Sequence, residues 1–351
     1  MAENILLIGS IPYETVEEVY RTFGGALDRH LAAIPDGEVG PRKHWISKVH
    51  YQVIAGHPDF DVVRHPAHEK GVERVNPRGV SDSWVFRVKT GIDRVRFGEP
   101  GWRLGYASDA VSSYFVFRTL RERGIFSSDK RFQVSLPSVN SVITPRVFTE
   151  PGDLEKIKPG YEDALLAELE MITQNIPPED LAIQWDCATE LQDAYGAVTE
   201  LDPATMIERN ISQFRRLNSV IPEKAWLGFH LCFGTLGGWP RFVPDDLRGA
   251  VEIANAFVEH SLRRVDWIHL PVLDRSDAAF FKDLENLKPA GARVYLGMIH
   301  NMDRFKERLA IARKYLPDFG LAAYCGLGRE DPEKLTSHLK DHLIAAEIAE
   351  F

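Results

Sequence analysis

Two side chains that commonly bind metals stand two positions apart in the segment His230-Leu231-Cys232. Because alternate residues of a β-strand point to the same side, a strand here would present His230 and Cys232 to one volume. An imidazole and a thiolate supply half of a typical zinc shell. A second thiol, Cys325, follows an apolar run that begins at Gly320. It could complete a three-ligand site with an open fourth position, as in catalytic zinc sites.

A zinc ion held by two thiolates and one imidazole has a low net charge and a soft character. Such an ion is suited to binding a substrate thiol and keeping it as a nucleophilic thiolate at neutral pH. It is less suited to activating water, because two thiolate ligands reduce its acidity. The ligand set therefore favours alkyl transfer to a thiol over hydrolysis. The third cysteine, Cys187, follows Asp186 directly, so strand alternation predicts that it faces away from Asp186 and packs in the core.

The elements that must position these residues follow a repeated pattern: a short apolar, β-branched run, a polar loop and an amphipathic helix. This alternation predicts parallel strands joined by helical crossovers, and eight strands in order predict a closed (βα)₈ TIM-type barrel. The expected strands are Asn4–Gly9, Leu31–Pro35, Phe132–Pro137, Leu181–Asp186, Ala225–Cys232, Val265–Pro271, Arg293–Ile299 and Gly320–Cys325. The clearest helices are Tyr161–Asn175, Pro203–Ser219, Asp246–Leu262, Met302–Leu316 and Asp331–Glu350.

One segment interrupts the regular pattern. The residues after the second expected strand, 36–130, are far more than one βα unit needs. We expect a long insertion at the barrel mouth, with a helix at Val111–Arg123, inside a single domain that spans residues 1–351. Long loops of this kind usually line or cover a functional site. A small separate domain is the alternative interpretation of this segment.

Composition excludes several classes of protein. The 351 residues are 44% hydrophobic and carry a formal net charge of -9, which disfavours nucleic acid as a partner. The first residues lack the features of a signal peptide, and no apolar run is long enough to cross a membrane. Three widely spaced cysteines predict free thiols in a reducing compartment. We therefore expect a cytoplasmic protein, and the sequence does not predict its oligomeric state.

Reactive side chains gather where the expected strands end, which is where barrel enzymes place their active sites. Each also has a purely structural alternative: a buried His or Cys can simply pack, Ser10 can cap a turn, and Glu38 can pair with Arg42. The candidates are Ser10, Glu38, Asp186, His230, Cys232, His269, His300 and Cys325.

The order of these residues resembles the C-terminal catalytic barrel of cobalamin-independent methionine synthase, in the superfamily shared with uroporphyrinogen decarboxylase and coenzyme M methyltransferases. The resemblance covers most of the chain. It rests on six short segments in the right order: Ile8-Gly9-Ser10-Ile11-Pro12, Asp36-Gly37-Glu38, Ile183-Gln184-Trp185-Asp186, His230-Leu231-Cys232-Phe233-Gly234, Met298-Ile299-His300 and Cys325-Gly326-Leu327.

The resemblance implies a role for each candidate. Ser10, with the Ile8–Gly9 backbone, would hold the carboxylate of homocysteine, and Glu38 and Asp186 would hold its amino group. Zinc would be the cofactor, and a methylfolate-type molecule the methyl donor. His300 would be the acid that protonates the departing folate nitrogen, which leaves badly unless it is protonated. The zinc ligands would be His230, Cys232 and Cys325.

The chain departs from the family pattern on its sixth expected strand. Methionine synthases carry a glutamate zinc ligand there, whereas this chain has His269 at the corresponding end. Either His269 is a fourth ligand or it is a core histidine. A second hypothesis is a decarboxylase-like lyase without a metal, whose mouth would be lined by Arg42, Arg87 and Arg329. A third is a non-catalytic barrel that binds zinc or another ligand.

Overall fold

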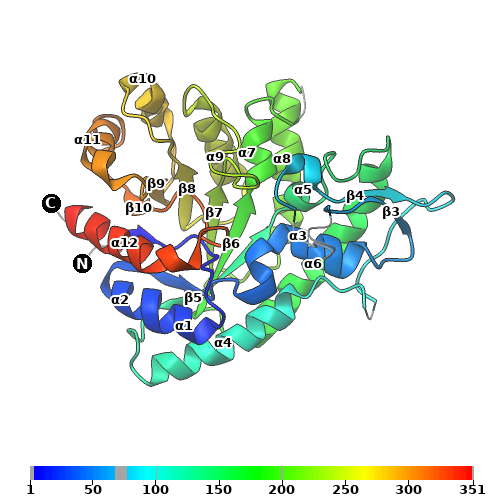
Figure 1. Ribbon diagram of the computed structural model, residues 1–351, viewed down its shortest axis with the longest axis horizontal. Helices are drawn as coiled ribbons and strands as arrows, with labels where there is room; N and C mark the ends of the chain where they lie inside the picture. The colour runs from blue at the N-terminus through cyan, green and yellow to red at the C-terminus, as the bar shows by residue number, and fades with distance from the viewer. Residues whose placement is uncertain (1–3, 68–76, 100, 199–200, 350–351) are drawn as a thin grey trace.

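Eight parallel strands wrap into a barrel at the centre of the molecule, as the sequence predicts (Figure 1). The computed structural model describes residues 4–67, 77–99, 101–198 and 201–349. The strands pair in the order β1-β10-β9-β8-β7-β6-β5-β2, and a parallel bridge between Ile5 and Leu31 closes the ring. They are β1 (Ile5–Leu6), β2 (Ala33–Pro35), β5 (Arg131–Pro137), β6 (Leu181–Cys187), β7 (Trp226–Leu231), β8 (Trp267–Pro271), β9 (Arg293–Gly297) and β10 (Gly320–Ala322).

Long helices cover the outside of the barrel between consecutive strands (Figure 1). The start of α8 is fixed by its sequence: Asp202 accepts a hydrogen bond from the Thr205 amide at 3.1 Å, and Pro203 occupies the first helical position. The long helices are α4 (Tyr106–Glu122), α6 (Asp153–Asn175), α8 (Pro203–Asn218), α9 (Arg248–His260), α11 (Phe305–Tyr315) and α12 (Leu335–Ala349). Shorter ones are α1 (Val16–Val19), α2 (Gly25–Leu27), α3 (Trp45–Val49), α5 (Val139–Val142), α7 (Ala188–Asp193) and α10 (Ala278–Phe281).

The long segment after β2 contains more structure than the predicted loop with one helix. The expected helix is present as α4, which packs against β5 and α6 as the crossover before β5. The preceding residues form α3 and an antiparallel hairpin of β3 (Phe60–Arg64) and β4 (Val85–Val88), which projects from the barrel in Figure 1. An aromatic cluster that includes Phe60 and Phe86, 6.3 Å apart, joins the hairpin to the core. The sequence pattern did not predict this hairpin, because its strands are short and interrupted by charged residues.

The barrel interior changes from apolar to polar toward the carboxyl ends of the strands. Its lower part is packed by apolar side chains such as Trp267 and Tyr295. Above them, Gln184 donates from its side-chain amide to the Ile8 carbonyl at 2.6 Å and to Asp186 at 2.7 Å. Since residues two apart on a strand share a face, Gln184 and Asp186 both point inward. Among the described helices, none is long and apolar enough to cross a membrane.

Candidate metal centre

The three predicted zinc ligands lie together at the carboxyl end of the barrel. Cys232 follows the last residue of β7, which also carries His230, and Cys325 lies three residues after β10. Their ligand atoms all lie within 4.8 Å of one another. The Sγ atoms of Cys232 and Cys325 are 3.0 Å apart, and the Cys325 Sγ is 3.7 Å from the Nε2 atom of His230. The carboxyl ends of β7 and β10, which are not adjacent in the sheet, therefore bring together residues 93 positions apart in sequence.

This donor set fits a zinc ion. Bonds of ~2.3 Å to sulfur and ~2.0 Å to nitrogen, in a tetrahedron, place ligand atoms roughly 3.3–3.8 Å apart. The sulfur–nitrogen distance of 3.7 Å falls in that range, and the two sulfurs must separate by less than about 1 Å to reach it. The Gly234 amide donates a hydrogen bond to the Cys232 sulfur at 3.2 Å. The contact with Cys232, together with burial, raises the pKa of the Cys325 thiol.

The third thiol, Cys187, is among the residues that line the same cavity but does not cluster with the other two. Cys187 is fully buried and its sulfur lies 3.8 Å from the Trp185 carbonyl oxygen. Burial is the main cause that raises the pKa of Cys187. It does not belong to the group of clustered metal-binding side chains among the described residues.

His269 lies directly behind His230, because the two are register partners on β8 and β7. Their Nδ1 atoms are 2.8 Å apart, and the Nε2 atom of His269 is 3.1 Å from the Ala323 carbonyl oxygen. A carbonyl only accepts, so His269 donates from Nε2 and accepts at Nδ1 from His230. Burial lowers the pKa of both rings, that of His269 to about 3, so both are neutral. The free lone pair of His230 is then on Nε2, toward the thiols. Both nitrogens of His269 have partners, which leaves neither for a metal in this arrangement.

Two carboxyl groups face the same cavity as the clustered thiols and imidazole. Burial raises the pKa of Glu38, and the negative charge of Asp186 raises it further. Burial also raises the pKa of Asp186. Both carboxyl oxygens of Glu38 are buried and have no hydrogen-bond partner among the described residues. Arg42, the partner considered for Glu38 in the sequence, instead binds Asp36 at 2.6 Å. Glu38 and Asp186 therefore place two buried carboxyl groups in the wall of one cavity.

Ser10 lies at the junction of the first and last strands. Its hydroxyl oxygen accepts a hydrogen bond from the Gly328 amide at 3.1 Å. A Cβ atom at Gly326 would come within 2.3 Å of the Ser10 hydroxyl, so only glycine permits this close approach. A Cβ atom at Gly9 would come within 2.7 Å of a Glu38 carboxyl oxygen. Gly9, Ser10 and Glu38 thus form one wall of the cavity that holds the thiols.

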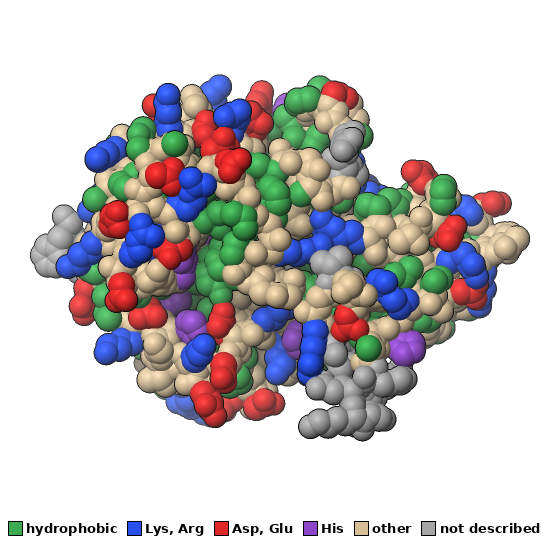
Figure 2. Space-filling model, turned by 45° about the horizontal axis from the view of Figure 1, so that its top comes forward, with side chains coloured by type: hydrophobic (Ala, Val, Ile, Leu, Met, Phe, Trp, Pro, Cys, Tyr) green, Lys and Arg blue, Asp and Glu red, His purple; other side chains and the backbone are tan. Residues whose placement is uncertain are grey.

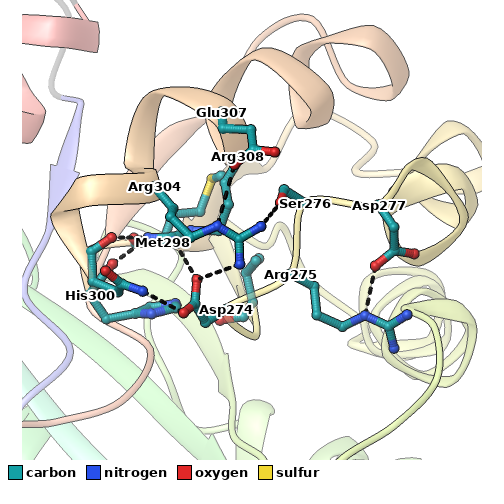
Figure 3. Close-up of polar contacts among 11 residues, drawn as sticks. Asp274, Arg275, Ser276, Asp277, Met298, His300, Arg304, Glu307 and Arg308 are labelled. Carbon is teal, nitrogen blue, oxygen red and sulfur yellow. Dashed lines mark hydrogen bonds and ion pairs between the residues drawn. The ribbon is translucent and has the colours of Figure 1, made fainter.

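The structure places His300 in a separate polar cluster, outside the described residues that line the cavity (Figure 3). Its Nε2 atom lies 2.8 Å from the Val272 carbonyl oxygen, and burial lowers its pKa to about 4. Arg308, fully buried, donates to the His300 carbonyl and binds Asp274 at 2.7 Å. The His300 ring also packs edge-on against Tyr324, with centroids 5.7 Å apart. This arrangement holds His300 beside Tyr324, the residue before Cys325, rather than among the described residues that line the cavity.

The cavity has a volume of about 1160 Å³, including its open mouth. The insertion contributes Lys43 and Trp84 to its lining, and Arg329 enters from the loop after β10. Of the other arginines expected around a lyase mouth, Arg42 pairs with Asp36, and Arg87 pairs with Asp61 at 3.1 Å on the hairpin. The sequence did not identify two further arginines that line the cavity, Arg146 and Arg241. They lie in irregular loops, where no periodic pattern fixes the direction of a side chain.

Comparison with solved structures supports the predicted resemblance at the level of fold. One similar structure is a B12-independent methionine synthase from Shewanella sp. W3-18-1 in complex with selenomethionine. Its TM-score is 0.63 at 15% identity, over 99% of this chain and 97% of that chain. Another is a putative vitamin-B12-independent methionine synthase from Listeria monocytogenes, with a TM-score of 0.51 at 13% identity, over 97% and 96%. Neither a family model nor a curated protein matches the chain. The chain has the fold of B12-independent methionine synthases.

Proposed function

We propose that this chain is a zinc-dependent transferase that moves a methyl or similar alkyl group onto the thiol of a homocysteine-like amino acid. The proposal rests on the side chains that line one cavity. The cavity combines a His-Cys-Cys ligand set with two buried carboxyl groups, of which Glu38 has no hydrogen-bond partner among the described residues. A ligand set of this kind suits a thiol, and an acidic pair suits an ammonium group. A thiol that also carries an amino group satisfies both.

The zinc ion would supply a Lewis acid that holds the acceptor sulfur as a thiolate at neutral pH. The lone pair on the His230 Nε2 atom and the two cysteines would hold the ion, and the contact with His269 would fix the orientation of the His230 ring. The acceptor ammonium would lie between Glu38 and Asp186 and compensate their buried charge. The Ser10 hydroxyl, which already accepts from the Gly328 amide, would donate its own proton to the acceptor carboxylate.

The donor we propose is of the methylfolate type. The acceptor sulfur forms a bond to the methyl carbon, the carbon–nitrogen bond breaks, and the electron pair returns to the donor nitrogen, which takes up a proton. His300 as the source of that proton stays a prediction. In its present position the Nε2 proton is directed to the Val272 carbonyl, so donation would require the ring to turn. The selenomethionine bound to the Shewanella enzyme supports an amino acid as one ligand of such a barrel.

The test is a binding and turnover experiment on zinc-loaded and cobalt-substituted protein. We expect L-homocysteine to add a sulfur-to-cobalt absorption band, and L-homoserine, which lacks the thiol, to leave the spectrum unchanged. With 5-methyltetrahydropteroyltriglutamate as donor, methionine should form and the Cys232→Ser variant should lose that activity. A non-catalytic zinc barrel would bind metal and show neither signal. A lyase would be indifferent to chelators, and full activity in Cys232→Ser would contradict the proposal.

A further inference from the structure

Three arginine side chains from three loops converge on the cavity that contains the candidate metal centre. Arg146 lies between α5 and α6, Arg241 lies between β7 and α9, and Arg329 follows β10; all three line the cavity. Figure 2 shows Lys and Arg side chains gathered near the middle of one face, between the barrel and the projecting hairpin. Loops from three separate strands therefore direct positive charge into one space.

Arg241 has the least compensated charge of the three. Burial, together with the positive charges of Arg146 and Arg329, lowers its pKa to about 10. Its aliphatic stem packs on Gly234, where an added Cβ would lie 3.4 Å away. Within the described parts of the chain, the Arg241 guanidinium makes no hydrogen bond or ion pair. The Arg241 side chain thus lies beside Gly234, and among the described residues its guanidinium N–H groups have no acceptor.

The other two arginines are oriented by neutral groups. Arg329 donates to the Thr235 hydroxyl at 2.7 Å, and Arg146 donates to the Ala197 carbonyl at 3.2 Å. Such contacts fix direction without cancelling charge. By contrast, Arg121 elsewhere in the chain binds Asp180 at 2.6 Å. The negative charge of Asp193 partly compensates Arg146, but none of the three arginines forms an ion pair with a described residue. Guanidinium groups that converge in this way gain most from an anion with several oxygens, because each guanidinium can donate two parallel hydrogen bonds to it.

We propose that Arg146, Arg241 and Arg329 form an anion subsite for the second substrate, the alkyl donor, which then carries a carboxylate or phosphate group. The assignment to the donor rests on the proposed function. There, the charged groups of the acceptor are already bound by Glu38, Asp186 and Ser10, so the arginines are left for the other substrate. The donor would lie with its anionic end on the arginines and its methyl group toward the thiols, within the same cavity.

The test is calorimetric titration of metal-free and zinc-loaded protein with inorganic phosphate and, separately, with succinate, at low ionic strength. We compare the wild-type chain with Arg241→Gln, with Arg241→Lys, and with Arg248→Gln as a matched control. Arg248 is an exposed arginine on α9 that pairs with Asp246 at 3.0 Å, away from the cavity. Unfolding by denaturant checks that every variant is folded. A last titration adds L-homocysteine to zinc-loaded protein saturated with the better anion.

We expect saturable binding of at least one anion that is about 10- to 100-fold weaker in Arg241→Gln, partly restored in Arg241→Lys and unchanged in Arg248→Gln. The preferred anion identifies the donor group, and homocysteine should still bind with the anion in place. Two results would contradict the anion subsite but not the proposed function. In the first, zinc-loaded protein binds homocysteine but no anion; in the second, Arg241→Gln binds the anion as tightly as the wild type. Competition between the anion and homocysteine would contradict the assignment of the subsite to the donor. Arginine-dependent anion binding without zinc or homocysteine binding would support the subsite and contradict the proposed function.

Discussion

The Nδ1 atoms of His230 and His269 lie 2.8 Å apart on adjacent strands, and this contact determines which nitrogen of His230 faces the thiols. The Ala323 carbonyl fixes the proton of His269 on Nε2, which makes Nδ1 the acceptor and His230 the donor. The lone pair of His230 is therefore directed at the cavity. A histidine that holds another histidine in this way replaces the carboxylate or carbonyl that usually orients a zinc-binding imidazole.

This relationship predicts that His269 controls metal affinity without binding the metal. We expect His269→Asn to weaken zinc binding about 10- to 100-fold, the usual effect of losing an orienting partner. At saturating zinc the variant should still bind one ion with one nitrogen and two sulfur ligands from the protein, as measured by X-ray absorption. His342→Asn, at another buried histidine on α12, is the matched control. If His269 is itself a ligand, the wild-type spectrum will show two protein nitrogens and the variant only one.

The carboxyl group of Glu38 is buried without a hydrogen-bond partner among the described residues. We expect it to strengthen binding of the acceptor while lowering the stability of the ligand-free protein. We expect Glu38→Gln to bind L-homocysteine about 10- to 100-fold more weakly, because a charge-assisted contact to its ammonium group is lost. The same change should stabilise the ligand-free protein at pH 8 by roughly 1 kcal/mol or more, since each unit of raised pKa corresponds to ~1.4 kcal/mol.

The sign of this stability effect follows from the raised pKa of Glu38 in the folded chain. The contribution of the neutral Glu38 carboxyl to the free energy of unfolding is complete below the pKa of the unfolded chain, ~4.3. This contribution is lost as the pH rises through the higher pKa of the folded chain. Denaturant unfolding at pH 5 and pH 8 should therefore show a gain for Glu38→Gln that is larger at pH 8. Glu285→Gln, at an exposed position, should show no such difference. A gain that is equal at both pH values would contradict the burial of a titrating carboxyl.

Zinc uptake should depend steeply on pH. The pKa of Cys325 is raised, so this thiol is protonated at neutral pH and must lose its proton to bind the metal. We expect the apparent zinc affinity to rise at least about tenfold per pH unit between pH 6 and pH 8. Calorimetry in two buffers of different ionisation enthalpy should detect at least one proton released per zinc. An affinity that is constant over this range would show that the thiols are not the ligands.

Sequence periodicity is sufficient to predict the barrel and the clustering of His230, Cys232 and Cys325 at one end of it. The strand that carries His230 and the run that ends near Cys325 are short and mostly apolar, and residues at the carboxyl ends of strands meet in a closed barrel. The pairing of His230 with His269 is not predictable in this way, because it depends on the exact register between β7 and β8. Arg241 was missed for a related reason: the direction of a loop side chain depends on tertiary contacts, here with Gly234.

The central claim is a zinc ion on His230, Cys232 and Cys325, and metal content tests it most directly. The protein is purified without added zinc or chelator, and its metal is measured beside a Cys232→Ser, Cys325→Ser double variant and a Cys187→Ala control. We predict about one zinc per chain in the wild type and the control, and none in the double variant. A folded wild-type protein that contains no zinc and takes up none, or a double variant that keeps its zinc, would contradict the account.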